Sequence, residues 1–353
     1  MLAAVLKDYG KLILDEIEKP APGPGEVVVR VRACGICGTD HKAVRGKRTN
    51  VDFPVILGHE NSGVVDAVGT AVEIFRPGDQ VIVAPIGGCG VCRHCRMGDV
   101  HFCEDSYTTG GEGAPVTLNG GFAEYMAVPA ALLYRKPPGV SFEAAAMTEP
   151  VSCAWKAVID YSAVKLGEDC VVIGVGGIGL LCLMLCIRAG AGRVIAVDTS
   201  QRALDKAREL GATHVFDAED GDVRSMIGRA LPDGPDFVIE AAGAPAAVEL
   251  ALSLRRRGTR VNIFGTTTPA PVEIDAGALN NMESVIEASF STTPKAMMQS
   301  ILLMERGVID PAQIVTHTFG LEDIHEAFAV MDSAERGKVV IVQGEEIRDH
   351  PEP

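Results

Sequence analysis

The sequence predicts an α/β fold in which a β-rich region precedes a doubly wound parallel sheet, and three observations lead to this prediction. Residues 1–150 contain short strand-like runs separated by glycine, proline and other turn residues. From about residue 151, strand-like and helix-like segments alternate, which is typical of a parallel sheet with right-handed crossovers. A glycine-rich turn joins the first strand and helix of the second region.

The composition is that of a globular protein, and the length suggests about two domains. The 353 residues are 47% hydrophobic and 22% charged, enough for a sizeable core. The formal net charge of −15 argues against binding to nucleic acid or anionic membranes, because both need basic surface. No signal pattern opens the sequence, and the longest apolar stretch, 179–187, is too short to span a bilayer. We therefore expect a soluble, cytoplasmic protein with no nucleic-acid or membrane partner.

The elements follow from the apolar patterns. The first region has strand-like runs at 26–34, 62–69, 79–85 and 122–129, which predict a compact β-barrel or sandwich with few helices. In the second region we predict strands at 169–174, 193–198, 213–217, 236–243, 260–265 and 284–290. The predicted helices between them are 177–189, 200–211, 222–231 and 245–256. Two further helices, 293–307 and 321–332, precede a last strand at 338–342.

Four cysteines lie in one short loop, "CGVCRHCRMGDVHFC", with the spacing C-x2-C-x2-C-x7-C. They are Cys89, Cys92, Cys95 and Cys103. In an intracellular chain this cluster indicates a metal site rather than disulfides, and four thiolates suit one tetrahedral zinc ion. An iron–sulfur cluster is the chemical alternative, and four unbound thiols would be open to oxidation. With four protein ligands the zinc would be structural.

The glycine-rich turn reads "VVIGVGGIG" and has the pattern G-x-G-x-x-G between a strand and a helix, with Asp198 at the end of the next strand. This context is the dinucleotide-binding fingerprint, in which the pyrophosphate lies at the helix N-terminus. A carboxylate at that place accepts hydrogen bonds from ribose hydroxyls and repels a 2′-phosphate, so NAD is the expected cofactor. A chance glycine turn is the alternative. The candidate cofactor-binding residues here are Gly174, Gly176, Gly177, Ile178, Gly179 and Asp198.

Two other short segments, "CGICGTDHK" (34–42) and "GHE" (58–60), contain further metal-binding residue types. Cysteine, histidine and carboxylate are all good zinc ligands, and three ligands with one open position describe a catalytic site. Taken separately, the cysteines are more often packing residues, and a histidine–glutamate pair is more often a buried hydrogen-bonded pair.

Taken together, these segments resemble the zinc-containing medium-chain dehydrogenases, the superfamily of alcohol, polyol and L-threonine dehydrogenases. The matching pieces occur in the family's order: "CGICGTD" (34–40), "GHENSGVV" (58–65), "GDQVIV" (78–83), the four-cysteine loop, "EP" (149–150) and "VGGIG" (175–179). The resemblance implies a GroES-like β-barrel catalytic domain at 1–150 and a Rossmann coenzyme domain at 151–292. It also implies that 293–353 returns to the catalytic domain.

The resemblance also implies roles for individual residues. Cys37 and His59 would be ligands of the catalytic zinc, and Cys34 would be a packing residue. Glu60 and Glu149 fall where family members use a carboxylate as a direct ligand or as a partner of the ligands. The resemblance leaves open which of the two binds the metal.

The proton path is implied in the same way. Thr39 matches the hydroxyl that takes the proton of the substrate. A relay histidine usually follows five residues after the zinc cysteine, but Lys42 stands there and His41 is one residue earlier. The outer end of the relay is therefore open between these two.

The resemblance also implies residues that contact the cofactor and residues that line the substrate pocket. Arg202 resembles the basic residue beside the adenosine ribose. "FGT" and "ASFS" resemble segments at the nicotinamide end, and their candidates are Phe264, Gly265, Thr266, Ser289 and Phe290. Asn61 replaces an aromatic residue often found after "GHE". Trp155 stands where family members with the "EP" motif commonly have a histidine. Its side chain would either line the substrate cleft or pack at the domain interface.

The expected activity is hydride transfer from a polar secondary alcohol of the polyol, sugar-alcohol or cyclitol type to NAD, which gives the ketone. The expected cofactors are NAD with one catalytic and one structural Zn²⁺ per chain, in a homotetramer or homodimer. The L-threonine or amino-alcohol branch of the family is the first alternative. A catalytically silent cofactor-binding protein is a distant one, because Cys37, Thr39, His59 and Glu60 are all present.

Overall fold

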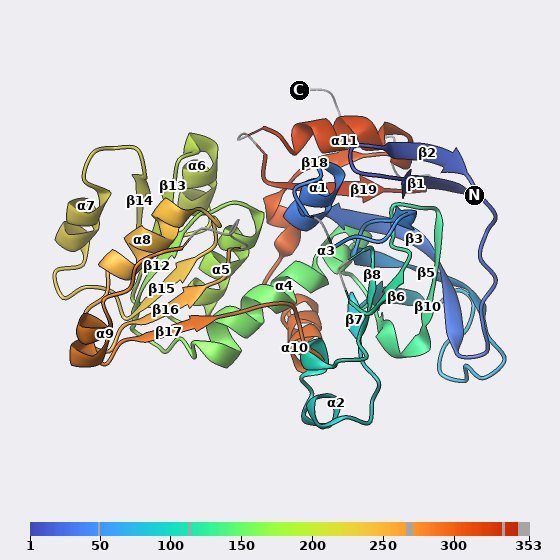
Figure 1. Ribbon diagram of the computed structural model, residues 1–353, viewed down its shortest axis with the longest axis horizontal. Helices are drawn as coiled ribbons and strands as arrows, with labels where there is room; N and C mark the ends of the chain where they lie inside the picture. Colours follow the sequence, from blue (N-terminus) through green and yellow to red (C-terminus); the bar gives the residue numbers. More distant parts are fainter. Residues whose placement is uncertain (49, 112–113, 266–270, 334–335, 345–353) are drawn as a thin grey trace. The chain divides into compact units, whose positions relative to one another are not determined.

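The computed structural model describes residues 1–48, 50–111, 114–265, 271–333 and 336–344 (Figure 1). Contacts divide the chain into two compact units. Unit 1 comprises Met1–Glu149 together with Thr292–Pro353, and unit 2 is the continuous segment Pro150–Ser291.

A seven-stranded sheet forms the centre of unit 1, with the order β11-β6-β5-β3-β19-β18 and with β10 also paired to β3. Its strands are β3 (Glu26–Ile36), β5 (Glu60–Val68), β6 (Gln80–Val83), β10 (Tyr125–Pro129), β11 (Leu133–Arg135), β18 (Val315–Phe319) and β19 (Lys338–Val342). β3 is long because its run of valines is buried, and one of its sides pairs first with β10 and then with β19. β19, the last strand among the described residues, is therefore inside the central sheet of unit 1.

The rest of unit 1 consists of short elements around this sheet. Two three-stranded sheets contain β1 (Leu2–Leu6), β2 (Leu12–Glu16) and β4 (Val55–Ile56), and β7 (Ile86–Gly87), β8 (Tyr107–Thr109) and β9 (Val116–Leu118). The helices are α1 (Gly38–Val44), α2 (Arg93–Met97), α3 (Phe142–Ala146), α10 (Pro294–Glu305) and α11 (Ile324–Val330). The β1–β2 hairpin is not evident from the sequence, because a short apolar run such as "LAAVL" does not distinguish strand from helix.

Unit 2 has a six-stranded parallel sheet with the order β14-β13-β12-β15-β16-β17. Its strands are β12 (Asp169–Ile173), β13 (Arg193–Asp198), β14 (His214–Asp217), β15 (Phe237–Glu240), β16 (Arg260–Ile263) and β17 (Val285–Ala288). The order runs outward in both directions from β12, so the predicted doubly wound Rossmann sheet is confirmed.

The helices of unit 2 pack their apolar faces on this sheet. They are α5 (Gly177–Arg188), α6 (Gln201–Glu209), α7 (Val223–Ala230), α8 (Pro245–Ser253) and α9 (Ala276–Met282). Ile227 of α7 and Val248 of α8 join buried residues of β12, β13, β15 and β16 in one hydrophobic cluster. α5 is buried along most of its length, as its nearly continuous apolar sequence predicts.

Between the predicted regions lie helical segments that the sequence analysis missed, α4 (Thr148–Trp155) and the π-helical turn η3 (Lys156–Tyr161). Pro150 inside this stretch argues against a helix interior. In the structure it occupies the first turn of α4, where a missing N–H leaves no helical bond unmade. Within the described ranges, no helix combines the length and the apolar character needed to cross a membrane.

Candidate functional site

The first candidate site lies where β3 ends and α1 begins. β3 ends at Ile36, α1 starts at Gly38, and Cys37 is the residue between them. The backbone N–H of Cys37 donates to Oδ2 of Asp40, at 2.9 Å, so the first turn of the helix is closed by its own side chain. Cys37 is therefore held in a fixed place at a helix N-terminus.

Asp40 also fixes the second half of the site. Its other oxygen, Oδ1, accepts the N–H of Gly58 at 3.2 Å and lies 3.6 Å from Nδ1 of His59. Gly58 has a φ of +93°, so the chain turns sharply before His59 and enters β5 at Glu60. One buried carboxylate thus joins the two sequence segments.

The structure brings Cys37, His59 and Glu60 together. One ligand atom from each lies within 4.8 Å of those of the other two, and His59 and Glu60 are almost fully buried. A thiolate, an imidazole and a carboxylate in this arrangement fit a zinc ion with an open coordination position. Glu149 is also buried, but it is not a member of this group of three.

Glu60 has a cationic partner that the sequence analysis did not identify. Nζ of Lys338, in β19, forms a buried ion pair with Oε1 of Glu60. Burial alone would lower the pKa of Lys338, but the charges of Glu60, Cys37 and Glu149 raise it above its ordinary value. No motif joins Lys338 to the site, because the contact is made by strand pairing between distant parts of the chain.

The predicted proton-path residues lie on α1, which begins directly after Cys37. Thr39 is half-buried in the first turn of the helix. Nε2 of His41 lies 2.9 Å from Oδ1 of Asp332, which also pairs with Arg45. His41 is therefore oriented by a carboxylate that follows α11, and its predicted role remains a prediction.

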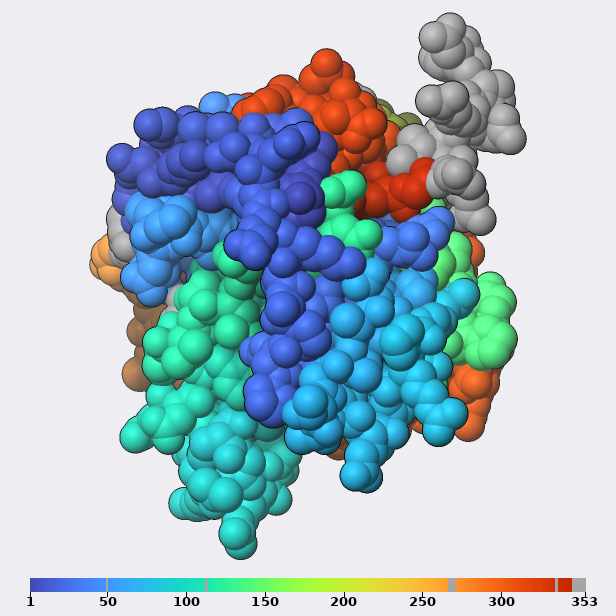
Figure 2. All heavy atoms as spheres, turned by 90° about the vertical axis from the view of Figure 1, so that its right-hand side faces the viewer, coloured from blue at the N-terminus to red at the C-terminus, as the bar shows by residue number. Residues whose placement is uncertain are grey.

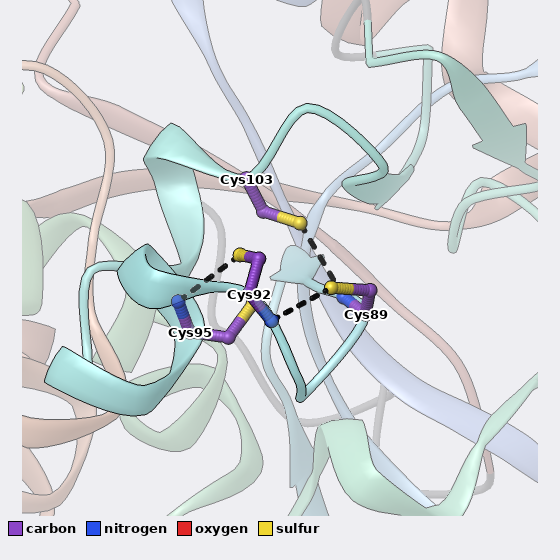
Figure 3. Close-up of side chains that lie close together, drawn as sticks. All are labelled: Cys89, Cys92, Cys95 and Cys103. Carbon is purple, nitrogen blue, oxygen red and sulfur yellow. Dashed lines mark hydrogen bonds between the residues drawn. The ribbon is translucent and has the colours of Figure 1, made fainter.

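The four-cysteine loop forms a second metal-type centre. The Sγ atoms of its four cysteines lie within 4.8 Å of one another and turn toward one point (Figure 3). Backbone N–H groups of Cys89, Cys92 and Cys95 each donate to a neighbouring Sγ at 3.4 Å. Such donors, chiefly from Val91 and Cys92, lower the pKa of Cys89 to about 7.

The loop is built to keep its sulfur atoms close. A Cβ at Gly88 would lie 2.5 Å from Sγ of Cys95, and Gly98 ends α2 with a φ of +90°. The loop stands out from the rest of unit 1 (Figure 2). Four thiolates with N–H donors around them fit a closed tetrahedral zinc site.

In unit 2 the glycine turn has the geometry of a dinucleotide-binding loop. Gly174 has a φ of +83°, and a Cβ at Gly179 would lie 1.8 Å from the carbonyl oxygen of Gly174, so strand and helix approach too closely for any side chain. A Cβ at Gly176 would meet nothing within 4 Å. The backbone there borders open space at the N-terminus of α5, and helix N-termini of this kind favour phosphate groups. Gly177 and Ile178 form the first turn of that helix.

Asp198 ends β13 next to this turn. Its Oδ2 accepts the N–H of Val175 at 2.7 Å, and its Oδ1 accepts the N–H of Ser200 at 2.9 Å. The carboxylate therefore ties the glycine turn to the start of α6, on which Arg202 is exposed. Each oxygen retains a lone pair for a further donor.

Glu240 organises the next part of the same sheet edge and was missed by the sequence analysis. Its Oε1 accepts the N–H groups of Ala242 and Gly243, and its carbonyl oxygen accepts those of Phe264 and Gly265. The signal for it in the sequence is an acidic residue at the end of a buried strand. Thr266 lies outside the described residues.

The other residues singled out in the sequence have defined surroundings. Ser289 accepts from the amide of Asn262 at 3.0 Å, whereas Phe290 is exposed. Trp155 is buried. Asn61 is buried and donates to the carbonyl of Gly58 at 3.0 Å, so it supports the turn before His59.

Two known protein families match parts of this chain, and several known dehydrogenases are similar to it. The alcohol dehydrogenase GroES-like domain family matches residues 23–138, and the zinc-binding dehydrogenase family matches residues 177–306. The chain is similar to an L-threonine 3-dehydrogenase of Anaeromyxobacter sp. strain Fw109-5, with 32% identity over 92% of this chain and 94% of the relative.

Two solved structures are similar over nearly their whole length. A zinc-binding dehydrogenase from Sinorhizobium meliloti 1021 bound to NADP has a TM-score of 0.89 and 31% identity, with coverage of 97% of this chain and 99% of that one. An alcohol dehydrogenase from Escherichia coli CFT073 complexed with NADH has a TM-score of 0.89 and 29% identity, with the same coverage.

Proposed function

The chain belongs to the zinc-containing medium-chain dehydrogenases, and on this basis we propose that it oxidises a polar secondary alcohol to the ketone with NAD as the hydride acceptor. Membership makes it an NAD(P)-dependent dehydrogenase of the alcohol type that acts on small molecules. Polyols, sugar alcohols and cyclitols are the proposed substrate class.

One observation carries the proposal, the convergence of Cys37, His59 and Glu60 within 4.8 Å in a buried place. When bound, zinc supplies Lewis acidity that lowers the pKa of an alcohol hydroxyl. The chain's own contribution is to hold these ligands in place before the metal arrives. Asp40 does this at both Cys37 and Gly58, and its carboxylate near Nδ1 favours Nε2 of His59 as the metal-binding nitrogen.

Proton removal is the second task of the residues around Cys37. We assign the hydroxyl of Thr39 as the group that accepts the alcohol proton, because it lies on the same first turn as the proposed metal ligand. His41, oriented by Asp332, is the candidate for passing the proton outward, with Lys42 as the other candidate. Bound NAD would accept the hydride of the carbinol carbon, so the products would be the ketone, NADH and one proton.

The cofactor preference is assigned to Asp198. Similar proteins bind NADP in one structure and NADH in another, so family membership alone leaves the choice open. The carboxylate of Asp198 is fixed by two backbone N–H groups at the end of β13, where a ribose 2′-hydroxyl can donate to it. A 2′-phosphate there would meet like charge, and this supports NAD.

L-Threonine is a second candidate substrate, because it is also a polar secondary alcohol. The observation in its favour is the 32% identity to an L-threonine 3-dehydrogenase over most of both chains. The position five residues after Cys37 holds Lys42, and this departure from the usual relay histidine favours neither candidate.

A substrate screen tests the proposal. NAD and NADP reduction should be measured with polyols, sugar alcohols, cyclitols, hydroxy acids and L-threonine, with zinc content determined on the same sample and Cys37→Ser as the inactive control. The highest kcat/KM with a polyol or cyclitol and NAD supports the proposal. The highest value with L-threonine selects the second candidate, and bound zinc without any turnover would indicate a silent protein.

A further inference from the structure

Three neighbouring strands build a contact across the backbone of β3. Gly35 of β3 is opposite Glu60 of β5 on one side and opposite Val340 of β19 on the other. Lys338, at the start of β19, reaches Oε1 of Glu60 from the far side of β3. The two charged side chains therefore meet over Gly35.

The absence of a side chain at Gly35 makes this contact fit. A Cβ there would lie 1.9 Å from Oε2 of Glu60 and 3.0 Å from Cε of Lys338. Neither contact is tolerable for a real Cβ without displacement of the pair. Gly35 is thus the gap through which a lysine from one strand reaches a carboxylate from another.

Stability alone is a weak reason for such a pair. Both side chains are at least nine-tenths buried, and desolvation of two charges offsets most of their attraction. The pair also leaves Oε2 of Glu60 buried, with no hydrogen-bond partner among the described residues. Oε1 of Glu60 is therefore taken by the lysine, which leaves Oε2 as the oxygen available to a metal bound by Cys37 and His59.

We propose that Lys338, reaching over Gly35, is a positioning residue that holds Oε1 of Glu60 away from the metal, so that Glu60 gives a single ligand oxygen and one coordination place stays open for the substrate. This inference rests on the proposed function. The ammonium group and the metal compete for the same carboxylate charge. Without the ammonium, both oxygens of Glu60 can bind the metal, and together with Cys37 and His59 they complete a shell of four ligand atoms.

The test replaces Lys338 by uncharged side chains and follows the metal itself. Lys338→Met should slow zinc release to a chelator by about tenfold. Changing a partner of a metal ligand usually weakens metal binding by about 10–100-fold, and the direction is reversed here because the metal gains a ligand atom. With Co²⁺ in the site, the visible absorption should weaken as the shell gains a ligand, and kcat should fall by a similar factor. Lys338→Arg should restore the wild-type values, because it keeps the charge.

The chain offers a matched control. Lys136 is also buried in unit 1, but its Nζ donates to the carbonyl oxygens of Pro137 and Val140 rather than to a metal ligand. Lys136→Met should lower stability without changing zinc release or the cobalt spectrum. Metal release from the four-cysteine loop serves as an internal reference in every variant.

The results separate this inference from the proposed function. If Lys338→Met loses stability but keeps the wild-type release rate and spectrum, or releases zinc faster, the lysine is structural and the inference is wrong. If Lys338→Met does not fold, Lys338→Gln repeats the test, and failure of both to fold while Lys136→Met folds also overturns it. If the wild-type chain binds no metal through Cys37, the proposed function itself fails.

Discussion

Asp40 is the side chain through which the two segments of the metal-type site are joined. It accepts from the backbone of Cys37 and of Gly58 and lies beside the ring of His59. We predict that Asp40→Asn, which keeps the size but removes the charge, weakens zinc binding and lowers kcat by about 10–100-fold. Chelator competition and steady-state kinetics measure both effects. Unchanged zinc affinity would mean that the carboxylate is only a helix cap.

Cys34 and Cys37 are three positions apart but have different surroundings. Cys34 is fully buried, which raises the pKa of its thiol, and its Sγ lies near a backbone carbonyl. We predict that Cys37→Ser lowers the affinity of the Cys37 site for zinc by more than about 100-fold. This exceeds the effect of changing a residue that only hydrogen-bonds to a ligand. Turnover should be lost, whereas NAD binding to unit 2 should persist in a fluorescence titration.

Cys34→Ser is the control for this variant. It should retain the metal and most of the activity, with a stability cost of about 1–3 kcal/mol for burying a hydroxyl in a packed place. Equal loss of zinc from both variants would contradict the assignment, since it would make the two cysteines a ligand pair.

The sequence motifs predicted the candidate metal ligands, but they did not predict the residues that contact those ligands. The segments "CGICGTD" and "GHE" resemble family motifs, and this resemblance pointed to Cys37, His59 and Glu60 as candidate ligands. The structure brings these three residues together. Asp40 and Lys338 were not assigned roles. Asp40 acts through backbone N–H groups, and Lys338 acts from a strand 278 positions away, so neither contact leaves a local pattern in the sequence.

Among the larger elements, the glycine turn between β12 and α5 depends on Asp198 for its shape as well as for its charge. Replacement of Asp198 by glycine would remove the acceptor for the N–H groups of Val175 and Ser200. Asp198→Asn is therefore the better test, because it removes the charge and keeps a side-chain oxygen. We predict that it narrows the preference for NAD over NADP by about tenfold, or ~1.4 kcal/mol, as like-charge repulsion is removed. The ratio of kcat/KM for the two cofactors measures this. A wild-type chain that uses both equally would contradict the role of Asp198.

We propose that the four-cysteine loop relies on a bound metal ion for folding energy. It contains the short helix α2 and a 3-10 turn at Val100–Phe102, and it exposes the apolar side chains of Val91, Met97 and Phe102. We predict that Cys92→Ser reduces the zinc content to one ion per chain and lowers Tm by about 2–4 °C for each kcal/mol lost. Cofactor binding by the folded fraction should be unchanged. Loss of turnover with both metals retained would assign the loop another role.

Alternating strand and helix patterns predicted the sheet of unit 2 almost strand for strand, because its short strands are separated by helices that are long enough to show their period. The same patterns predicted β3, β5, β6 and β10 but missed two-residue strands such as β4 and β7. Strands of that length have no periodicity. Their existence is decided by the neighbours they pair with.

For the molecule as a whole, the insertion of β19 beside β3 makes unit 1 dependent on the end of the chain. Unit 2 is continuous and has its own sheet and hydrophobic cluster. We predict that a chain ending at residue 291 keeps NAD binding but loses the metal of the Cys37 site, because β3 loses its pairing with β19. Limited proteolysis and metal analysis measure the outcome. A truncated chain that retains both metals would show that unit 1 folds without β18 and β19.

This insertion also sets an order of events during synthesis on the ribosome. Glu60 emerges 278 residues before Lys338, which at typical elongation rates is a delay of about 15–60 s. Unit 2 is complete before β19 leaves the exit tunnel, so it can fold while the thiol of Cys37 is still outside a finished sheet. In the cell, we therefore expect the Cys37 site to bind its metal only after translation ends, when unit 2 has already folded.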